Sequence, residues 1–191
     1  MTLPKELSAQ NRSIAIDIDG VIADQIAPIL KIVDNRYGLT FQYEDVTDFS
    51  FENCLGLPKG ANKLLIDEYN NHYLKSAKMI RHADIGLNYI FQNFYAQIVT
   101  SRNDPKGATA TWLKNNLLRY HTLEFVSHQN KADRYEELQP ILVIEDAPDI
   151  AIETAKRNLQ VALVNAPWNQ NVAHPNIFRI ENLKDVIRLV K

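Results

Sequence analysis

The chain of 191 residues is long enough for one domain, or for one domain that carries a sizeable insertion. Its 46% hydrophobic and 23% charged residues are typical of a globular protein, and a net charge of −2 without a basic tract argues against a protein held mainly by nucleic-acid phosphates. The single cysteine, Cys54, excludes an internal disulfide and a cysteine-rich zinc site.

The amino-terminal residues 1–12 are polar and lack the apolar core that a signal peptide needs. No apolar run approaches the length of about 18 residues that crossing a membrane requires. We therefore expect a cytoplasmic protein that does not enter the membrane. A homodimer is compatible with a chain of this size, although no feature of the sequence specifies one.

Five short apolar runs predict the strands of a sheet. They are residues 13–18, 97–100, 124–127, 141–144 and 161–164. Because these runs lack strict alternation, they suit parallel strands that are covered on both faces. Apolar residues at helical spacing lie between them, so the pattern predicts an α/β fold with a doubly wound, Rossmann-like parallel sheet.

Helix boundaries are predicted at three places in the second half of the chain. Asp104-Pro105 is a favourable helix start, with a capping oxygen and a proline at the first helical position. Asp149 is predicted to cap another helix. Apolar residues between 180 and 190 recur at helical spacing and indicate a carboxyl-terminal helix.

One interval breaks this rhythm of strands and helices. From Asp17 to Thr100 the chain is much longer than one crossover helix requires, and it contains two amphipathic stripes. We predict that residues 25–79 form a small helical cap inserted after the first strand. Residues 1–24 and 80–191 are then the α/β core.

Two aspartates separated by one residue end the first predicted strand. In open α/β sheets ligands bind beyond the carboxyl ends of the strands, so Asp17 and Asp19 are expected in the functional site. Gly20 lets the chain turn sharply there, because it has no Cβ.

A second acidic group, Glu145 and Asp146, follows the strand at 141–144, and Asp149 comes three residues later. If the two strands are parallel neighbours, these carboxylates converge on those of the first group. Carboxylates that share a site repel each other unless a cation lies between them. Oxygen ligands with room for water and phosphate favour Mg²⁺ over zinc.

Polar residues also end the second and third strands. Thr100, Ser101 and Arg102 place two hydroxyls and a guanidinium at the same edge of the sheet, where we expect them to bind an anionic substrate. Lys131 follows the third strand and can neutralise a cluster of carboxylates and phosphate.

This set of residues resembles the four motifs of the haloacid dehalogenase superfamily, in type, order and strand context. The matching segments are Asp17–Val21, Thr100, Lys131 and Glu145–Asp146 with Asp149. The resemblance extends from Ser13 to about Ala166, and it implies a phosphatase on an α/β core.

The resemblance implies a role for each motif residue. Asp17 attacks phosphorus and forms an aspartyl-phosphate, while Asp19 protonates the leaving oxygen and then deprotonates water. Mg²⁺ is held by the carboxylates of Asp17 and Asp146 and by the backbone carbonyl of Asp19. Thr100 and Lys131 bind the phosphoryl oxygens.

Two acidic residues are expected to support these groups. Glu145 is predicted to orient Lys131 or a water of the metal, and Asp149 to lie just behind the metal ligands. Asp149 is equally well explained as a helix cap, and Arg102 as a solvent-facing residue.

Within the superfamily, the stretch DIDGVIAD from Asp17 to Asp24 is most similar to the 5′(3′)-deoxyribonucleotidases and related bacterial nucleotidases. Three later segments agree with them, at residues 99–102, 130–133 and 166–169. The resemblance therefore implies a Mg²⁺-dependent hydrolase of phosphomonoesters, acting on nucleoside monophosphates.

Other functions remain open at this point. The substrate is alternatively another small phosphometabolite or the end of a nucleic acid, although the lack of a basic face weakens the latter. A non-catalytic binding protein with the same fold is a further alternative, but it would not need both Asp17 and Asp19. Kinase and dehydrogenase functions are disfavoured because the chain has neither glycine-rich phosphate loop.

The aromatic residues of the cap and the histidines could have either a structural or a functional role. The cap aromatics either stack on a nucleobase or form the core of the cap; they are Phe41, Tyr43, Phe49 and Phe51. The five histidines, which include His128, show no metal-binding spacing and are expected to be surface or packing residues.

Overall fold

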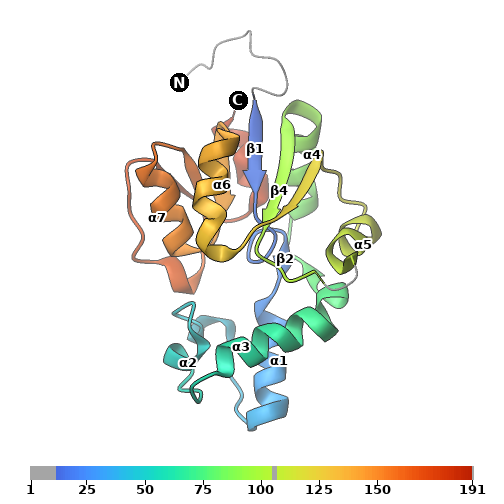
Figure 1. Ribbon diagram of the computed structural model, residues 1–191, viewed down its shortest axis with the longest axis vertical. Coiled ribbons are helices and arrows are strands. Elements are labelled where there is room, and N and C mark those ends of the chain that lie inside the picture. Colours follow the sequence, from blue (N-terminus) through green and yellow to red (C-terminus); the bar gives the residue numbers. More distant parts are fainter. Residues whose placement is uncertain (1–11, 105–106, 191) are drawn as a thin grey trace.

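The computed structural model describes residues 12–104 and 107–190. Most of the amino-terminal segment assessed for a signal peptide, and Pro105 of the predicted helix start, therefore lie outside the described residues. The core is a six-stranded sheet with the order β5-β4-β1-β6-β7-β8, in which every neighbouring pair is parallel (Figure 1). The prediction of a doubly wound α/β fold is confirmed.

The strands of this sheet are short and mostly buried. They are β1 (Ser13–Ile16), β4 (Tyr95–Thr100), β5 (Thr122–Phe125), β6 (Leu142–Glu145), β7 (Val161–Val164) and β8 (Ile177–Ile180). β1 lies between β4 and β6, so the chain adds strands on one side of β1 and then on the other. Such a reversal of strand order opens a crevice at the carboxyl ends of the strands.

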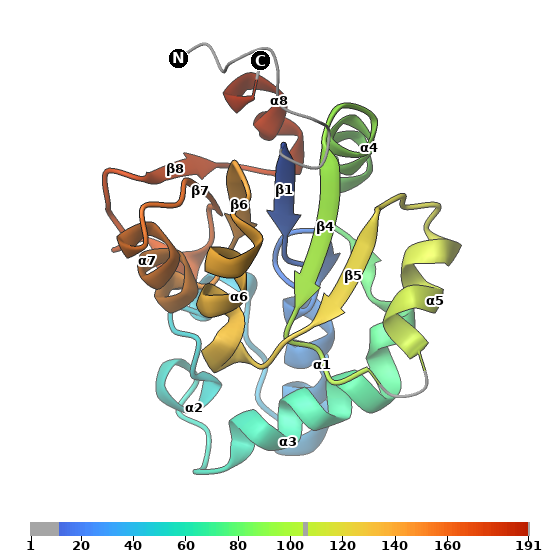
Figure 2. The ribbon, with the colours of Figure 1, turned by 45° about the horizontal axis from the view of Figure 1, so that its top comes forward.

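Helices cover both faces of the sheet, as Figure 2 shows. On one face lie α6 (Lys131–Leu138) and α7 (Pro148–Lys156), and on the other lie α4 (Ala83–Asn93) and α8 (Val186–Leu189). α5 (Ala108–Asn115) follows β4. Because side chains alternate along a strand, Ile14 and Ile16 of β1 join the α4 side of the core, whereas Ala15 packs on the α6 side. Each of the three side chains is fully buried.

The inserted segment, residues 25–79, lies beyond the carboxyl ends of β1 and β4 (Figure 1). A short antiparallel ribbon of β2 (Ala23–Asp24) and β3 (Lys78–Met79) stands at its base. Its helices and helical turns are α1 (Ile26–Tyr37), a 3-10 turn (Tyr43–Asp45), α2 (Phe51–Cys54), α3 (Ala61–Glu68), a π-helical turn (Tyr69–Tyr73) and a 3-10 turn (Leu74–Ser76). Gly38 ends α1 in the left-handed conformation, with φ of 66°.

The prediction of one helix over residues 180–190 is wrong. Ile180 ends the edge strand β8, and the residues after it form a 3-10 turn (Leu183–Asp185) and the short helix α8. The apolar spacing predicted the buried side chains correctly, since they include Leu183, Val186 and Val190. It did not predict that these residues are divided between a turn and a short helix. Within the described residues, no helix combines the length and the apolar character needed to span a bilayer.

Candidate active site

The turn after β1 places Asp17 and Asp19 at the edge of the sheet. The Asp17 N–H donates to the Ile144 carbonyl over 3.0 Å, which continues the pairing of β1 with β6. The carbonyl of Ile18 then accepts hydrogen bonds from three N–H groups further along, so the chain folds back tightly. Gly20 adopts a φ of 74° in this turn, and a Cβ there would lie 2.0 Å from Oδ2 of Asp146. The glycine is therefore required both by the turn and by the neighbouring carboxylate.

Asp146 follows β6, and its backbone carbonyl is fixed by two side chains. Its carbonyl accepts hydrogen bonds from Trp168 Nε1 at 3.2 Å and from Asn169 Nδ2 at 2.9 Å. Both donors belong to the 3-10 turn Pro167–Asn169 after β7. This turn thus fixes the backbone of Asp146.

Lys131 begins α6 and bridges two carboxylates. Its Nζ lies 2.7 Å from Asp17 Oδ1 and 2.5 Å from Glu145 Oε1, and the residue is only 1% exposed. Burial alone would lower the pKa of Lys131, but Asp17 and Glu145 raise it overall, so the side chain stays a cation.

Glu145 is surrounded by hydrogen-bond donors. Besides Lys131, the Tyr135 hydroxyl donates to its Oε1 over 2.9 Å, and the N–H groups of Asp146 and Ala147 donate to its Oε2. These contacts fix Glu145 beside Lys131. They also leave Asp17 and Asp146 as the carboxylates that are available to a metal ion.

The charges of this cluster do not balance. Oxygen atoms of Asp17, Glu145 and Asp146 lie within 4.8 Å of one another, and Lys131 is the ammonium group that contacts the cluster. Burial, opposed by Lys131 and reinforced by Glu145 and Asp19, raises the pKa of Asp17 to about 7. Burial and the charges of Asp17 and Glu145 raise the pKa of Asp146 well above its ordinary value. A divalent cation with a preference for oxygen ligands would compensate this excess of negative charge.

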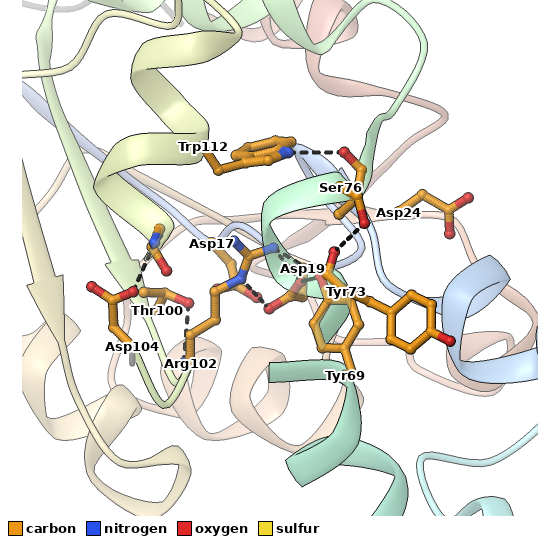
Figure 3. A network of polar contacts seen from close by, with 12 residues as sticks. Asp17, Asp19, Asp24, Tyr69, Tyr73, Ser76, Thr100, Arg102, Asp104 and Trp112 are labelled. Atoms are coloured by element: carbon orange, nitrogen blue, oxygen red, sulfur yellow. Dashed lines mark hydrogen bonds and ion pairs between the residues drawn. The ribbon is translucent and has the colours of Figure 1, made fainter. Parts of the chain in front are cut away.

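The end of β4 presents Thr100 and Ser101 to the same edge. Thr100 is 1% exposed and its Oγ1 accepts a hydrogen bond from the Arg102 N–H over 3.3 Å, whereas Ser101 is exposed. The Arg102 guanidinium, predicted to bind substrate, is buried against Asp19 (Figure 3). Its Nε donates to Asp19 Oδ2 over 2.7 Å and its Nη2 to Oδ1 over 2.6 Å. The alternative of a solvent-facing Arg102 is therefore wrong.

Asp149 lies apart from the carboxylate cluster. Its side chain is 61% exposed, and its Oδ2 lies 2.7 Å from Nε2 of His128. This hydrogen bond lowers the pKa of Asp149 and raises that of His128. Asp149 stands in the first turn of α7 and does not cap it, because Ala147 occupies the capping position and Pro148 the first helical one.

A cleft of about 290 Å³ lies between the carboxylates and the inserted segment. Its floor carries Asp17, Asp19, Thr100, Ser101, Arg102, Lys131 and Asp146. Its other walls are largely apolar and include Phe49, Phe51 and Trp168, with Phe49 and Trp168 in edge-to-face contact at 6.1 Å between ring centres. The cleft is close to the lower end of the range of small-molecule sites, about 300–1,000 Å³.

Solved structures with a similar fold cover almost the whole chain. A haloacid dehalogenase-like hydrolase of Streptococcus pneumoniae matches with a TM-score of 0.69 and 14% identity, over 96% of this chain and 100% of that protein. A haloacid dehalogenase-type hydrolase of Bacillus subtilis, solved with magnesium bound, matches with a TM-score of 0.63 and 16% identity, over 94% and 98% of the two chains. The fold that the predicted resemblance implies, that of haloacid dehalogenase-type hydrolases, is confirmed.

Sequence relatives also match most of the chain. A protein of Clostridium acetobutylicum named as a nucleotidase is 26% identical over 186 residues, covering 93% of each chain. A protein of Halalkalibacterium halodurans, named provisionally as a nucleotidase, is 23% identical over 175 residues, covering 91% of this chain and 89% of its own. No protein-family model matches the chain.

Three residues at the candidate site were not assigned a site role from the sequence. Tyr69 of the inserted segment donates its hydroxyl to Asp19 Oδ1 over 3.1 Å, and Tyr135 reaches Glu145. His128, expected to be an ordinary surface or packing residue, lines the cleft. Burial and the charge of Asp19 raise the pKa of Tyr69, so its hydroxyl remains a donor. No local motif marked these residues, because their partners lie far away in the sequence or on another element.

Proposed function

We propose that this protein is a Mg²⁺-dependent phosphomonoester hydrolase that acts through an aspartyl-phosphate on Asp17, with nucleoside monophosphates as its substrates. The observation that carries the proposal is the buried contact of Asp17 with Lys131 beside Asp146, at the floor of an apolar cleft. Residues 25–79 act as the cap in this proposal, and the nucleotidase names of the sequence relatives support the substrate class.

In the first step an oxygen of Asp17 attacks phosphorus, and the bond from phosphorus to the leaving oxygen breaks. Asp19 gives its proton to that oxygen, so the product leaves as an alcohol. The ammonium of Lys131 and the hydroxyls of Thr100 and Ser101 hold the phosphoryl oxygens while negative charge develops on them. Arg102 is occupied by Asp19 and is not one of these phosphate-holding groups.

In the second step Asp19 takes a proton from water, whose oxygen attacks phosphorus. The bond between phosphorus and the Asp17 oxygen breaks, which releases inorganic phosphate and restores both carboxyl groups. Glu145 keeps Lys131 in place throughout, since it is the second carboxylate that contacts the lysine. Each half of the reaction thus uses the same two aspartates.

The donor set fits Mg²⁺, with the carboxylates of Asp17 and Asp146 and the backbone carbonyl of Asp19 as its protein ligands. When bound, the ion would neutralise part of the negative charge of the phosphate and of Asp17. The magnesium in the structure of the Bacillus subtilis hydrolase supports this choice of metal.

The walls of the cleft support a substrate with a flat apolar part. Phe49 and Trp168 meet edge to face, and Phe49 is 45% exposed, so aromatic surface remains for contact with a planar ring. Stacking on aromatic side chains contributes about 1–3 kcal/mol per nucleobase. Sugar phosphates would use only the polar floor, which is why we favour nucleotides.

Phosphate release from a panel of mononucleotides and sugar phosphates, with Mg²⁺ or with EDTA, tests the proposed function. We expect Mg²⁺-dependent release that favours nucleotides, and a Phe49→Ala variant that loses this preference while it retains activity on sugar phosphates. Equal turnover of all substrates would contradict the substrate class. No turnover of any phosphomonoester, with the protein folded, would contradict the enzyme assignment.

The affinity for Mg²⁺ should depend on pH near neutrality. Because the pKa of Asp17 is raised to about 7 without metal, protons and Mg²⁺ compete for this carboxylate below that pH. We expect the affinity measured by calorimetry to fall as the pH decreases through about 7, with protons released on binding. An affinity that is constant between about pH 6 and 8 would show that Asp17 is not a ligand.

A further inference from the structure

Two side chains, Arg102 and Tyr69, contact the carboxylate of Asp19 from two sides. Arg102, after β4, contacts both of its carboxylate oxygens, and the Tyr69 hydroxyl donates to Oδ1 over 3.1 Å. Nη2 of Arg102 also donates to the Tyr69 hydroxyl over 3.1 Å, so the three side chains form a closed triangle (Figure 3). They come from three parts of the chain, since Tyr69 is separated from Asp19 by 50 residues and Arg102 by 83.

Arg102 is itself fixed and cannot easily follow a movement of Asp19. Its side chain is 1% exposed, and its guanidinium lies 5.5 Å from the ring centre of Trp112. Trp112 in turn donates its Nε1–H to the Ala77 carbonyl over 2.8 Å, at the end of the inserted segment. The planar fork of an arginine bound through two nitrogens fixes the plane of its partner carboxylate as well as its position.

Tyr69 brings the inserted segment into this arrangement. It is fully buried and begins the π-helical turn Tyr69–Tyr73, a type of turn that is frequent at functional sites. Because Arg102 belongs to the core, the Tyr69 hydroxyl is the direct hydrogen bond from the inserted segment to Asp19 among residues 12–104 and 107–190. The orientation of Asp19 therefore depends on the presence of the inserted segment over the site.

We infer that Tyr69 and Arg102 are positioning residues that hold the Asp19 carboxylate in its working orientation, with Tyr69 linking that orientation to the inserted segment. This inference rests on the proposed function, in which Asp19 passes the proton to and from the reacting oxygens. A displacement of a reacting group by about 1 Å is enough to cost about 100-fold in rate. Tyr69 and Arg102 act through Asp19 and need no contact with the leaving group.

A kinetic double-mutant cycle tests the inference. Tyr69→Phe removes one hydroxyl and keeps the buried ring, so we expect kcat to fall about 10-fold with KM changed less than about twofold. In an Asp19→Asn background the same substitution should have no further effect on the residual activity, because Tyr69 acts only through Asp19. Tyr73→Phe is the matched control, since this tyrosine lies in the same turn and its hydroxyl makes no hydrogen bond to the described residues.

The dependence of the rate loss on the leaving group is a second measurement. A purely structural role of Tyr69 would not change it. The loss in Tyr69→Phe should be large for a nucleotide and small for 4-nitrophenyl phosphate, whose leaving oxygen needs little protonation. Arg102→Lys should show the same dependence on the leaving group, because lysine cannot make the paired contact. Equal losses for both substrates, an undiminished loss in the Asp19→Asn background, or an equal loss in Tyr73→Phe would each overturn the inference.

The contact can also be measured without any activity. Thermal unfolding of the single and double variants at Tyr69 and Asp19 should be non-additive, because the two side chains are in direct contact. If wild type hydrolyses no phosphomonoester while this coupling is present, the proposed function fails and the triangle is only structural, so the positioning role fails with it. If wild type is active and the kinetic cycle is additive, only the positioning role fails.

Discussion

Asp17→Asn is expected to abolish phosphate release, by about 10⁴-fold or more in kcat, while it raises the melting temperature of the metal-free protein at pH 8. The loss of rate follows because an amide cannot attack phosphorus. The gain in stability follows from the raised pKa. The pKa of Asp17 is about 7 in the folded protein, against an ordinary value of 3.8. At pH 8 the carboxyl is ionised in both states, and its ionisation in the folded state lowers the free energy of unfolding. The amide that replaces it carries no such charge.

The size of this stabilisation is limited by the difference between the two pKa values of Asp17. It is reduced further because an amide pairs less well with Lys131 than a carboxylate does. A pKa of about 7 against 3.8 sets an upper bound of about 4 kcal/mol at pH 8. The gain should disappear below about pH 4, where Asp17 is protonated in both the folded and the unfolded chain. Asp67→Asn is the control, because Asp67 is half exposed and pairs with Lys63 on the surface of α3. Unchanged kcat, or a lower melting temperature at pH 8, in Asp17→Asn would contradict the roles given to this residue.

Gly20→Ala should weaken the binding of Mg²⁺ about 10- to 100-fold and destabilise the fold, because its new methyl group would meet the Asp146 carboxylate. The Cβ would lie 2.0 Å from Oδ2 of Asp146, so the carboxylate has to move. A positive φ adds a backbone cost of about 1 kcal/mol. Overpacking adds about 1–3 kcal/mol more.

Gly38→Ala separates these two costs. Gly38 has a φ of 66°, close to the 74° of Gly20, but a Cβ at Gly38 would meet no atom of the described residues within 4 Å. The two variants should therefore share the backbone cost, and only Gly20→Ala should change the Mg²⁺ concentration at half-maximal activity. The same Mg²⁺ dependence in both variants would show that Asp146 does not hold the ion.

Much of the core and the floor of the cleft could be predicted from the sequence because their signals are local. Apolar runs marked β1, β4, β5, β6 and β7, and the strand order then brought Asp17 and Asp146 together, since β1 and β6 are parallel neighbours. The edge strand β8 was missed because Arg179 interrupts its apolar residues, so it has no continuous apolar run. Its last residue, Ile180, was instead assigned to the helix that follows.

The partners of Arg102 and His128 could not be predicted from the sequence. Arg102 was expected to bind substrate or face solvent, yet it contacts Asp19 across 83 residues of sequence. His128 pairs with Asp149 on the neighbouring helix α7, and no spacing within one element encodes that contact. Such pairs depend on how the helices and loops meet in space, which residue type and local periodicity do not specify.

A rapid acid quench followed by peptide mass spectrometry tests the central claim most directly. Wild-type protein is mixed with excess nucleotide and Mg²⁺, stopped during the first turnovers and digested. We predict one phosphoryl group on the peptide that contains Asp17, present with Mg²⁺ and absent with EDTA, and accumulating further in Asp19→Asn. Turnover of the nucleotide with no phosphoryl group on the protein at any time would mean that water attacks directly, and would contradict the role of Asp17 as nucleophile.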